Sequence, residues 1–575
     1  MRKKIVRRLH SEQSIAALNH LHPLLQRIYA ARDIQSPDAL DKTLDSLLSY
    51  QTLLGIEKAT QLLADAVTQN KKILIVGDFD ADGATSTAVA VRALKSFGAE
   101  QVQFLVPNRF AFGYGLTPEL VDVAKTFSPD VIVTVDNGIA NHAGVSAAKA
   151  LGISVIITDH HLAASTLPEA DAIVNPNQPH DTFPSKHLAG VGVIFYVMLA
   201  LRRHLQQQQW FEKKRLPEPV MARLLDLVAL GTVADLVSLD KNNRILVHHG
   251  LKRIRAGQCA PGIVALLELA NRDFTRAQAA DLGFAVGARL NAAGRMDDMA
   301  LGIECLLCDD SIRVREMARI LDQLNDERKH VEQDMQGQAL LALNQLTEKL
   351  AGELPRGLCL YDASWHQGVI GILASRIKDK FNRPVIVFAP GQENEMKGSA
   401  RSIAGLHIRD VLALIDAKYP ELILKFGGHA MAAGLTIEKN NFTKFTTLFN
   451  EIVSEQLSEA ALQHCLWSDG ELTSADYSLD VAQLMREAGP WGQAFPEPLF
   501  DDVFRIVEQR IVGDKHLKLR LSKDEKIIDA IAFFVDTNEW PNHRLESVRA
   551  AFRLDINEYK GRSNVQLIVD YLEPA

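Results

Sequence analysis

Apolar runs alternate with helix-like segments over the first third of the chain. Four of these runs are near-continuous stretches of Val, Ile and Leu, at residues 71–78, 102–108, 130–138 and 154–161. The segments between them have helical character, as in residues 84–98. Strands that are apolar on both faces are typical of parallel sheets covered by helices on both sides. We therefore predict the α/β class, with a doubly wound parallel sheet.

The rest of the chain divides into a helical region, a second α/β segment and a β-rich end. Helical spacing dominates residues 188–350, and one apolar face of a long helix is predicted by Ile320, Leu324, Val331 and Met335. A strand–helix–strand pattern begins near 356, and alternating strands after 466 indicate a small β-barrel. The expected organisation is two α/β lobes joined by a long helix, followed by the barrel: an arm (1–50), the first lobe (51–309), the connecting helix (310–350), the second lobe (351–460) and the barrel (461–575).

Composition narrows the class of protein without identifying its function. Of 575 residues, 47% are hydrophobic and 23% charged, which is ordinary for a soluble globular protein. The net charge of −8 argues weakly against a nucleic-acid ligand, but metal-binding carboxylates count as negative only until they hold cations. Five scattered cysteines do not suit a disulfide framework. The basic N-terminus lacks the apolar segment of a secretory signal, and the longest apolar run is short for a membrane span. We expect a cytoplasmic protein without membrane contact.

Acidic and imidazole side chains follow three of the predicted strands. In open α/β sheets, functional sites lie at the carboxyl ends of the strands, so side chains far apart in the chain can converge there. A fourth acid interrupts an apolar run, where an uncompensated carboxylate would be costly to bury. The candidates, in chain order, are Asp78, Asp80, Asp82, Asp136, Asp159, His160, His161 and Asp235.

This cluster of acids predicts a metal site. Carboxylates without cations would repel one another and any phosphate, whereas oxygen ligands mixed with histidine nitrogen suit Mn²⁺ better than Ca²⁺. The cluster has more ligands than one ion needs, and two ions could clamp the attacking and leaving oxygens of a displacement. The alternative is that these residues cap helices or form turns, since Asp after a strand often does so. For Asp235 the same alternative is a helix cap.

The motifs resemble those of a known family. DFDADG (78–83), VDNG (135–138), DHH (159–161) and TVADLV (232–237) are similar to the DHH phosphoesterase superfamily. Five further motifs resemble the RecJ branch of that superfamily, with its DHHA1 domain. They are RLNAAGRM (289–296), HQGVIGILASR (366–376), GSARSI (398–403), GGHAMAAG (427–434) and PWGQAFPEPLF (490–500). The resemblance covers nearly the whole chain. One departure is Ala400, where relatives often have glycine.

The resemblance implies roles for individual residues. Asp78, Asp80 and Asp136 would hold one Mn²⁺, and Mg²⁺ is the other candidate ion. The second ion would be held by Asp82, Asp136, His160 and Asp235, with Asp136 shared. His161 would contact the scissile phosphate or help orient the site, and Asp159 would orient a neighbour. Contacts to the nucleic acid would come from Arg109, Tyr114, Arg289, Asn291, Arg295, Arg376, Ser399, Arg401, Gly428 and His429.

Several of these contact residues have an alternative reading, and for His429 it is packing in place of substrate contact. Arg109 could be an ordinary surface arginine. Arg289 and Arg295 flank small residues that would allow close approach of a ligand, but they could instead pair with acids such as Asp297 and Asp298. Gly427 and Gly428 could form an anion-binding nest or a plain tight turn.

Three functions are open at this point. The resemblance implies a monomeric 5′→3′ exonuclease that degrades single-stranded DNA in recombination and repair, assisted by a single-strand-binding protein and a helicase. The β-rich end would then be an OB-like module that holds the strand. The alternative enzyme is a pyrophosphatase, or a phosphatase of nucleotides or short oligonucleotides, which would not need this module. A non-catalytic single-strand binder should have lost metal ligands, and this chain retains them.

Overall fold

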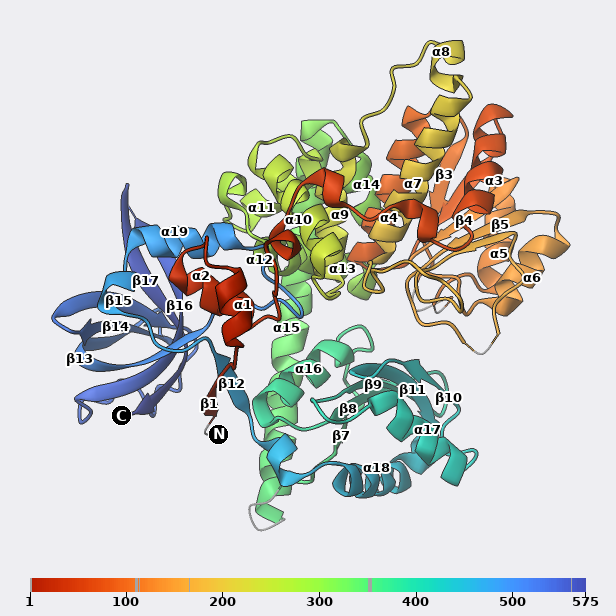
Figure 1. Ribbon diagram of the computed structural model, residues 1–575. Coiled ribbons are helices and arrows are strands. Elements are labelled where there is room, and N and C mark those ends of the chain that lie inside the picture. The colour runs from red at the N-terminus through yellow and green to blue at the C-terminus, as the bar shows by residue number, and fades with distance from the viewer. Residues whose placement is uncertain (1–2, 109–111, 113, 165, 350–353, 560) are drawn as a thin grey trace. The chain divides into compact units, whose positions relative to one another are not determined.

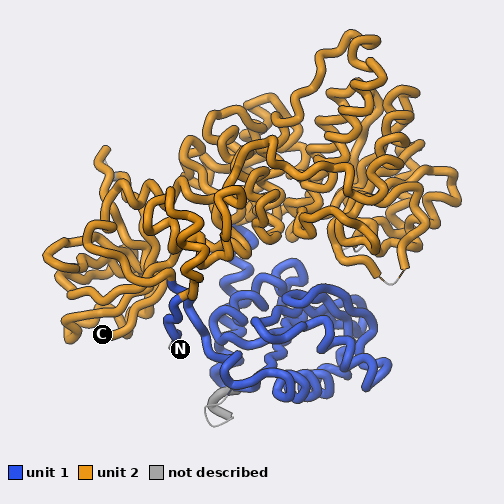
Figure 2. The backbone as a smooth tube through the Cα atoms, in the orientation of Figure 1, with its two compact units in different colours: residues 1–7, 326–468 blue, residues 8–325, 469–575 orange. Residues whose placement is uncertain are grey.

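The computed structural model describes residues 3–108, 112, 114–164, 166–349, 354–559 and 561–575. The chain forms two compact units (Figure 2), one of residues 1–7 and 326–468 and the other of residues 8–325 and 469–575. We call them unit 1 and unit 2. Unit 2 contains the first α/β domain and the barrel, and unit 1 contains the second α/β domain.

The first domain is built on a parallel five-stranded sheet with the order β3-β2-β4-β5-β6. The prediction of a parallel sheet is confirmed, and the structure adds a fifth strand, β6, which the sequence did not predict. Chain order reverses between β2 and β4, and ligands bind at such switch points in open α/β sheets. The strands are β2 (Ile73–Val76), β3 (Val102–Leu105), β4 (Val131–Val135), β5 (Ser154–Thr158) and β6 (Ala172–Val174).

Both faces of this sheet are buried, as its apolar runs predict. Ile73 and Ile75 belong to the main apolar core, while Leu74 and Val76 belong to a second core on the other face. Helices α3 (Ile56–Thr68), α4 (Ala81–Ser96) and α7 (Gly190–Gln207) contribute to the main core, and α5 (Pro118–Ala124) and α6 (His142–Ala150) to the second (Figure 1). The alternation of strand side chains therefore explains the three-layer arrangement.

A helical region completes the first domain and leads into the longest helix, α15 (Ser311–Lys349). A connecting helix was predicted, but its apolar face was partly misassigned. Ile320 is 44% exposed, whereas Val314, Ala318 and Leu321 are buried. A π-helix (Leu282–Gly287) precedes α13. The shorter helices here are α8 (Trp210–Lys214), α9 (Leu225–Ala234), α10 (Lys241–Arg255), α11 (Pro261–Leu269), α12 (Ala279–Asp281), α13 (Ala288–Met296) and α14 (Ala300–Leu307).

Unit 1 contains a mixed five-stranded sheet with the order β10-β11-β9-β8-β7. Only β7 and β8 pair in parallel. Its strands are β7 (Leu358–Tyr361), β8 (Val385–Pro390), β9 (Glu395–Arg401), β10 (Lys425–Gly428) and β11 (Ala432–Glu438), and its helices are α16 (Ile370–Phe381), α17 (Ile408–Lys418) and α18 (Phe442–Gln456). A separate parallel pair, β1 (Lys4–Arg7) with β12 (Cys465–Ser468), joins the two ends of this unit.

The β-rich end forms a closed barrel with the strand order β13-β14-β15-β17-β16. β15 and β17 pair in parallel and the other neighbours are antiparallel. This confirms the predicted OB-like barrel. Its strands are β13 (Phe500–Val512), β14 (His516–Lys523), β15 (Lys526–Ala532), β16 (Ser547–Tyr559) and β17 (Arg562–Pro574), and the helices before it in unit 2 are α1 (Glu12–Ala17), α2 (Pro23–Ala30) and α19 (Leu479–Ala488).

None of the helices in the described part of the chain is long and apolar enough to cross a membrane.

Candidate metal centre

The predicted acidic and imidazole side chains meet at the carboxyl edge of the first sheet. Asp78 follows β2, Asp136 follows β4, and His160 follows β5. Asp82 lies in the first turn of α4, and Asp235 directly follows α9. The site therefore lies at the switch point between β2 and β4, where the sheet topology places ligands.

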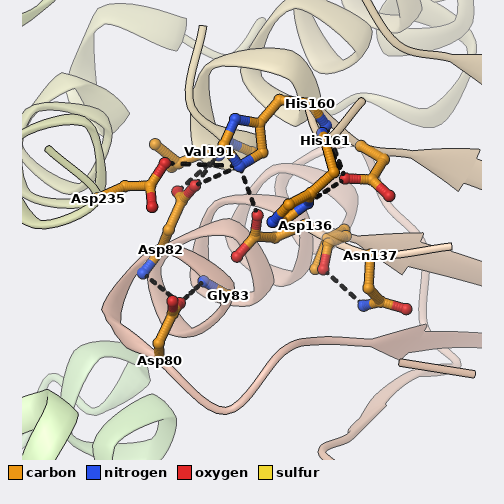
Figure 3. Close-up of polar contacts among 12 residues, drawn as sticks. Asp80, Asp82, Gly83, Asp136, Asn137, His160, His161, Val191 and Asp235 are labelled. Carbon is orange, nitrogen blue, oxygen red and sulfur yellow. Dashed lines mark hydrogen bonds and ion pairs between the residues drawn. The ribbon is translucent and has the colours of Figure 1, made fainter. Parts of the chain in front are cut away.

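Three overlapping groups of side chains are close enough to hold a metal ion. Within each group, one ligand atom per residue lies within 4.8 Å of the others. The groups are Asp78, Asp80 and Asp136; Asp82, His160 and Asp235; and Asp136, His160 and His161. His160 is central (Figure 3): its Nε2 lies 3.1 Å from Asp136 Oδ1, 3.5 Å from Asp235 Oδ2 and 3.8 Å from Asp82 Oδ2.

Asp82 is held by the N-terminus of α7. The backbone N–H of Gly190 donates to Asp82 Oδ2 at 2.6 Å, and that of Val191 donates to Asp82 Oδ1 at 2.9 Å. The first N–H groups of a helix lack partners within the helix and favour an anion. A Cβ at Gly190 would lie 2.7 Å from Asp136 Oδ1, so the close approach needs glycine. This contact was not predicted, because the apolar pattern of residues 188–201 indicates only a buried helix.

The helix-cap reading of Asp80 is correct and compatible with a metal site. Asp80 Oδ1 accepts the N–H groups of Asp82 and Gly83, both at 3.0 Å, and so caps α4. Capping fixes the direction of the carboxylate. Asp235 also occupies a cap position, the C-cap of α9, where the helix dipole disfavours negative charge. A cation would offset that repulsion.

Asp159 orients the two histidines. Its Oδ1 accepts the N–H of His160 at 2.7 Å and lies 2.7 Å from His161 Nδ1. Burial disfavours the charged forms of Asp159 and His161, but the negative carboxylate and the positive imidazole attract each other. The pKa of Asp159 is lowered to about 2 and that of His161 is raised to about 9. Asn175 and Asn177 complete the support, because their amides donate to the carbonyls of His161 and His160. The sequence did not point to either asparagine.

The electrostatics of the cluster favour binding of a cation. Burial, and then the Asp235 carboxylate, raises the pKa of Asp82 to about 7. Burial and Asp80 raise the pKa of Asp235 to about 8. Burial and Asp82 raise the pKa of Asp136 well above its usual range. The ionised carboxylates repel one another, and cations bound between them would offset that repulsion.

Unsatisfied atoms test whether this donor set fits a metal. Within the described residues, Asp136 Oδ1 and His160 Nε2 are buried without a hydrogen-bond partner, although they lie 3.1 Å apart. Buried polar atoms of this kind need a ligand. Carboxylate oxygen together with imidazole nitrogen suits Mn²⁺ and related divalent ions. The cluster can therefore hold a metal.

The predicted nucleic-acid contacts in unit 2 divide into two kinds. The Tyr114 hydroxyl donates to the carbonyl of Asp136 at 3.1 Å and lies 3.2 Å from His161 Nδ1, so it borders the metal centre. Asn291 also reaches the centre, where its Oδ1 accepts the N–H of Ala81 at 2.8 Å. Arg295 lies in the last turn of the same helix, α13. Arg109 falls outside the described residues.

Arg289 follows the alternative reading, with a different partner. It is 8% exposed, and its Nε and a terminal nitrogen lie 2.8 and 2.7 Å from Asp322 Oδ1 on α15. The sequence suggested Asp297 or Asp298 as the acid. Among the small residues beside Arg289, Gly294 lies against the backbone of residue 79, since a Cβ at Gly294 would lie 1.7 Å from Phe79 O.

The predicted contacts in unit 1 lie on its sheet and on α16. Arg376 donates from Nε to Glu332 at 2.8 Å, with its side chain 58% exposed. Arg401 donates to Ser399 Oγ at 3.1 Å and to Ser375 Oγ at 3.2 Å. Gly428 has φ +143°, and the N–H of the exposed His429 bonds Ala432 O at 2.7 Å, so this loop forms a tight turn between β10 and β11.

Family models match three parts of the chain: the DHH family N-terminal domain at residues 72–232, the DHHA1 domain at 354–455 and the RecJ OB domain at 468–571. Fold and site thus define a phosphoesterase of the DHH class. Single-stranded-DNA-specific exonucleases named RecJ from Salmonella typhimurium and Escherichia coli are 52% and 53% identical over 571 residues, with 99% of each chain covered. The chain belongs to the RecJ family.

Solved structures agree with this assignment. RecJ from Thermus thermophilus in complex with Mn²⁺ matches with a TM-score of 0.80 at 29% identity, covering all of this chain and 80% of that chain. The Mg²⁺ complex of the same protein matches with a TM-score of 0.74 at 27% identity, covering all of this chain and 79% of that chain. The relatives with a solved structure thus include metal complexes.

Proposed function

We propose that this chain is an exonuclease that hydrolyses single-stranded DNA from its 5′ end with two divalent metal ions, Mn²⁺ in preference to Mg²⁺. One observation carries the proposal. The segments that follow β2, β4, β5 and α9 bring buried and half-buried candidate metal ligands together around His160 and Asp136. The relatives that match this chain over nearly their whole length are named single-stranded-DNA-specific exonucleases.

Two ion positions are proposed, with Asp136 between them. Asp78, Asp80 and Asp136 would hold one ion, and Asp82, Asp136, His160 and Asp235 the other. When bound, such ions polarise the phosphoryl oxygens and lower the pKa of a water molecule. The chain's own contribution is to hold these ligands in place. The backbone of α7 fixes Asp82, and Asp159 fixes His160.

His161 would face the phosphate as a cation. Burial disfavours the charged imidazole, but the bond to Asp159 outweighs burial and raises the pKa of His161, whereas metal ions bound nearby would act in the opposite direction. Tyr114 borders the same imidazole and would limit its movement. A charged, fixed donor stabilises negative charge that develops on a phosphoryl oxygen.

Arg401 is the best-supported phosphate contact in unit 1. Its guanidinium donates to two serine hydroxyls and to the carbonyl of Ala400, and in the described part of unit 1 it forms no ion pair with a carboxylate. Burial lowers the pKa of Arg401, so an anionic ligand would stabilise its charge. Ser399, Arg376, Gly428 and His429 are the other candidate strand contacts in unit 1. Arg109 and Arg295 are the candidates in unit 2. Arg289 is the weakest candidate, because Asp322 already neutralises it.

The barrel would hold the strand away from the metal centre. Its strand order is that of OB folds, in which the second and third strands and adjoining loops bind oligonucleotides. Lys518 and Arg520 lie on β14 in this region. A smaller substrate, such as pyrophosphate or a dinucleotide, would not need the barrel. We further propose that the enzyme is a cytoplasmic monomer that acts in recombination and repair with a single-strand-binding protein and a helicase.

Digestion of labelled strands tests this function. Long single strands labelled at either the 5′ or the 3′ end, a matched duplex and a dinucleotide are incubated with the full chain and Mn²⁺. We expect early release of the 5′ label, no attack on the duplex and no turnover in EDTA. Faster hydrolysis of the dinucleotide than of the long strand would contradict the proposal, as would activity in EDTA.

A further inference from the structure

The first turn of α4 depends on a partner 210 residues away. Asp80 caps the N–H groups of Asp82 and Gly83, and this leaves the N–H of Ala81 without a partner in its own helix. Asn291 Oδ1 on α13 accepts that N–H at 2.8 Å. Ala81 stands between two proposed metal ligands, Asp80 and Asp82, so this bond ties α13 to the stretch of backbone that carries both carboxylates.

α13 also contacts the preceding residue of this loop, through Gly294. A Cβ at Gly294 would lie 1.7 Å from Phe79 O and 2.9 Å from Phe79 C. These are backbone atoms, so no side chain can turn away to relieve the overlap. Alanine is normally the better residue in a helix, and glycine at this position therefore serves the contact and not the helix.

α13 is in turn fixed to α15. Arg289 places two nitrogens within 2.8 Å of Asp322 Oδ1, and a third donates to Ala285 O in the π-helix at 2.9 Å. Both ends of the connection are thus defined. One end is an ion pair with α15, and the other is the backbone of the loop 78–82, which we call the metal loop.

We propose that α13 sets the geometry of the metal loop, with Asn291 as a positioning residue and the Arg289–Asp322 pair as its anchor. The inference rests on the proposed function, because it concerns the same metal centre. It assigns Asn291 and Arg289 to the support of the ligands and not to contact with the substrate. Residues that orient metal ligands change metal affinity when they are replaced, even without touching the ion.

The test is a titration of the full chain with Mn²⁺ in the absence of DNA, following free Mn²⁺ by electron paramagnetic resonance. Asn291→Leu keeps the approximate size of the side chain but removes the acceptor, and we expect about tenfold weaker binding. Asn291→Asp keeps an oxygen in the same place, and its affinity should stay within about threefold of the wild type or exceed it. If Asn291 only stabilised the fold, Asn291→Leu and Asn291→Asp would lose the same Mn²⁺ affinity.

Two further variants have matched controls. Gly294→Ala should weaken Mn²⁺ binding, whereas Gly337→Ala, in a helix where a Cβ meets nothing within 4 Å, should not. Asp322→Asn should weaken binding by about threefold, and its effect should not add fully to that of Asn291→Leu, since both act through α13. Asp326→Asn, which breaks an ion pair within α15 itself, is its control.

Failure of this inference is distinguishable from failure of the proposed function. If Asp136→Asn weakens Mn²⁺ binding while Asn291→Leu and Gly294→Ala bind as the wild type, the positioning role is overturned and the metal centre stands. If the wild-type chain binds no Mn²⁺, both are overturned. Circular dichroism melting of each variant identifies any that fail to fold. If Gly294→Ala or Asp322→Asn fails to fold, the comparison of Asn291→Asp with Asn291→Leu decides the question.

Discussion

The backbone N–H of Gly190 donates to Asp82 Oδ2 at 2.6 Å, and a Cβ at the same glycine would lie 2.7 Å from Asp136 Oδ1. One residue at the start of α7 therefore contacts two proposed metal ligands that come from different strands. The close packing of α7 against the sheet edge brings these carboxylates together, and it also makes the site sensitive to added volume.

Gly190→Ala should disable the metal centre. The added methyl group cannot fit without moving Asp136 or α7, and such overpacking costs about 1–3 kcal/mol of the free energy of unfolding. We expect loss of cleavage together with weaker Mn²⁺ binding. The measurements are strand digestion and urea unfolding, and Gly337→Ala is the control. Wild-type cleavage by the Gly190 variant would show that the close approach is not needed.

Asp136→Asn should abolish cleavage and yet stabilise the metal-free protein. Burial and neighbouring carboxylates raise the pKa of Asp136, so its charge destabilises the folded state when no cation is present. Removing that charge should add on the order of 1–2 kcal/mol in EDTA. Added Mn²⁺ should then stabilise the wild type more than the variant. Thermal melting with EDTA and with Mn²⁺ measures both effects, and a variant that is less stable than wild type in EDTA would argue against a site strained by repulsion.

Arg401→Gln should weaken binding of single strands and lower its dependence on salt. Loss of one phosphate contact reduces the slope of log K against log salt by about 0.7 for a single strand. Arg409→Gln, at an exposed position on α17, is the matched control and should leave the slope unchanged. Fluorescence anisotropy of a labelled strand in EDTA, over a series of salt concentrations, gives the slopes. Equal slopes for wild type and Arg401→Gln would remove the proposed phosphate contact.

His248 should make the free energy of unfolding depend on pH, independently of the metal centre. Burial, and then the charge of Lys42, lowers the pKa of His248 to about 4. Between about pH 4 and the usual value of 6.5, the unfolded chain binds a proton that the folded chain does not, so stability falls as pH falls through this window. His248→Gln should flatten this part of the curve by on the order of 1 kcal/mol, since the half-exposed ring is screened by solvent. Parallel unfolding curves for the two proteins across this range would contradict the assignment.

Local sequence patterns predicted the sheet and the ligand set, because each depends on contiguous residues. The run Ile73–Val76 is apolar at every position, and the acids follow it directly. Two other features depend on contacts between distant segments. The bond from Gly190 to Asp82 spans 108 residues, and no local pattern at Gly190 distinguishes it from other buried helix residues. Arg289 was expected to pair with a nearby acid, if with any, but folding brings Asp322 closer.

Helix faces and short strands were predicted less well, for related reasons. Ile320 fits a helical stripe in the sequence, but the face that packs is set by neighbours from other segments and includes Ala318 and Leu321. Strand β6 has three residues, too few to show a period of two. β1 pairs with β12 across most of the chain, a contact that depends on the whole fold.

The proposed metal-binding cluster has Asp136 and His160 at its middle. Anomalous diffraction from crystals of the full chain grown with Mn²⁺ locates the bound ions. We expect two anomalous peaks at this edge of the first sheet, one bordered by Asp78, Asp80 and Asp136 and the other by Asp82, His160 and Asp235. Bound Mn²⁺ confined to other surfaces, with no peak beside Asp136, would contradict this expectation.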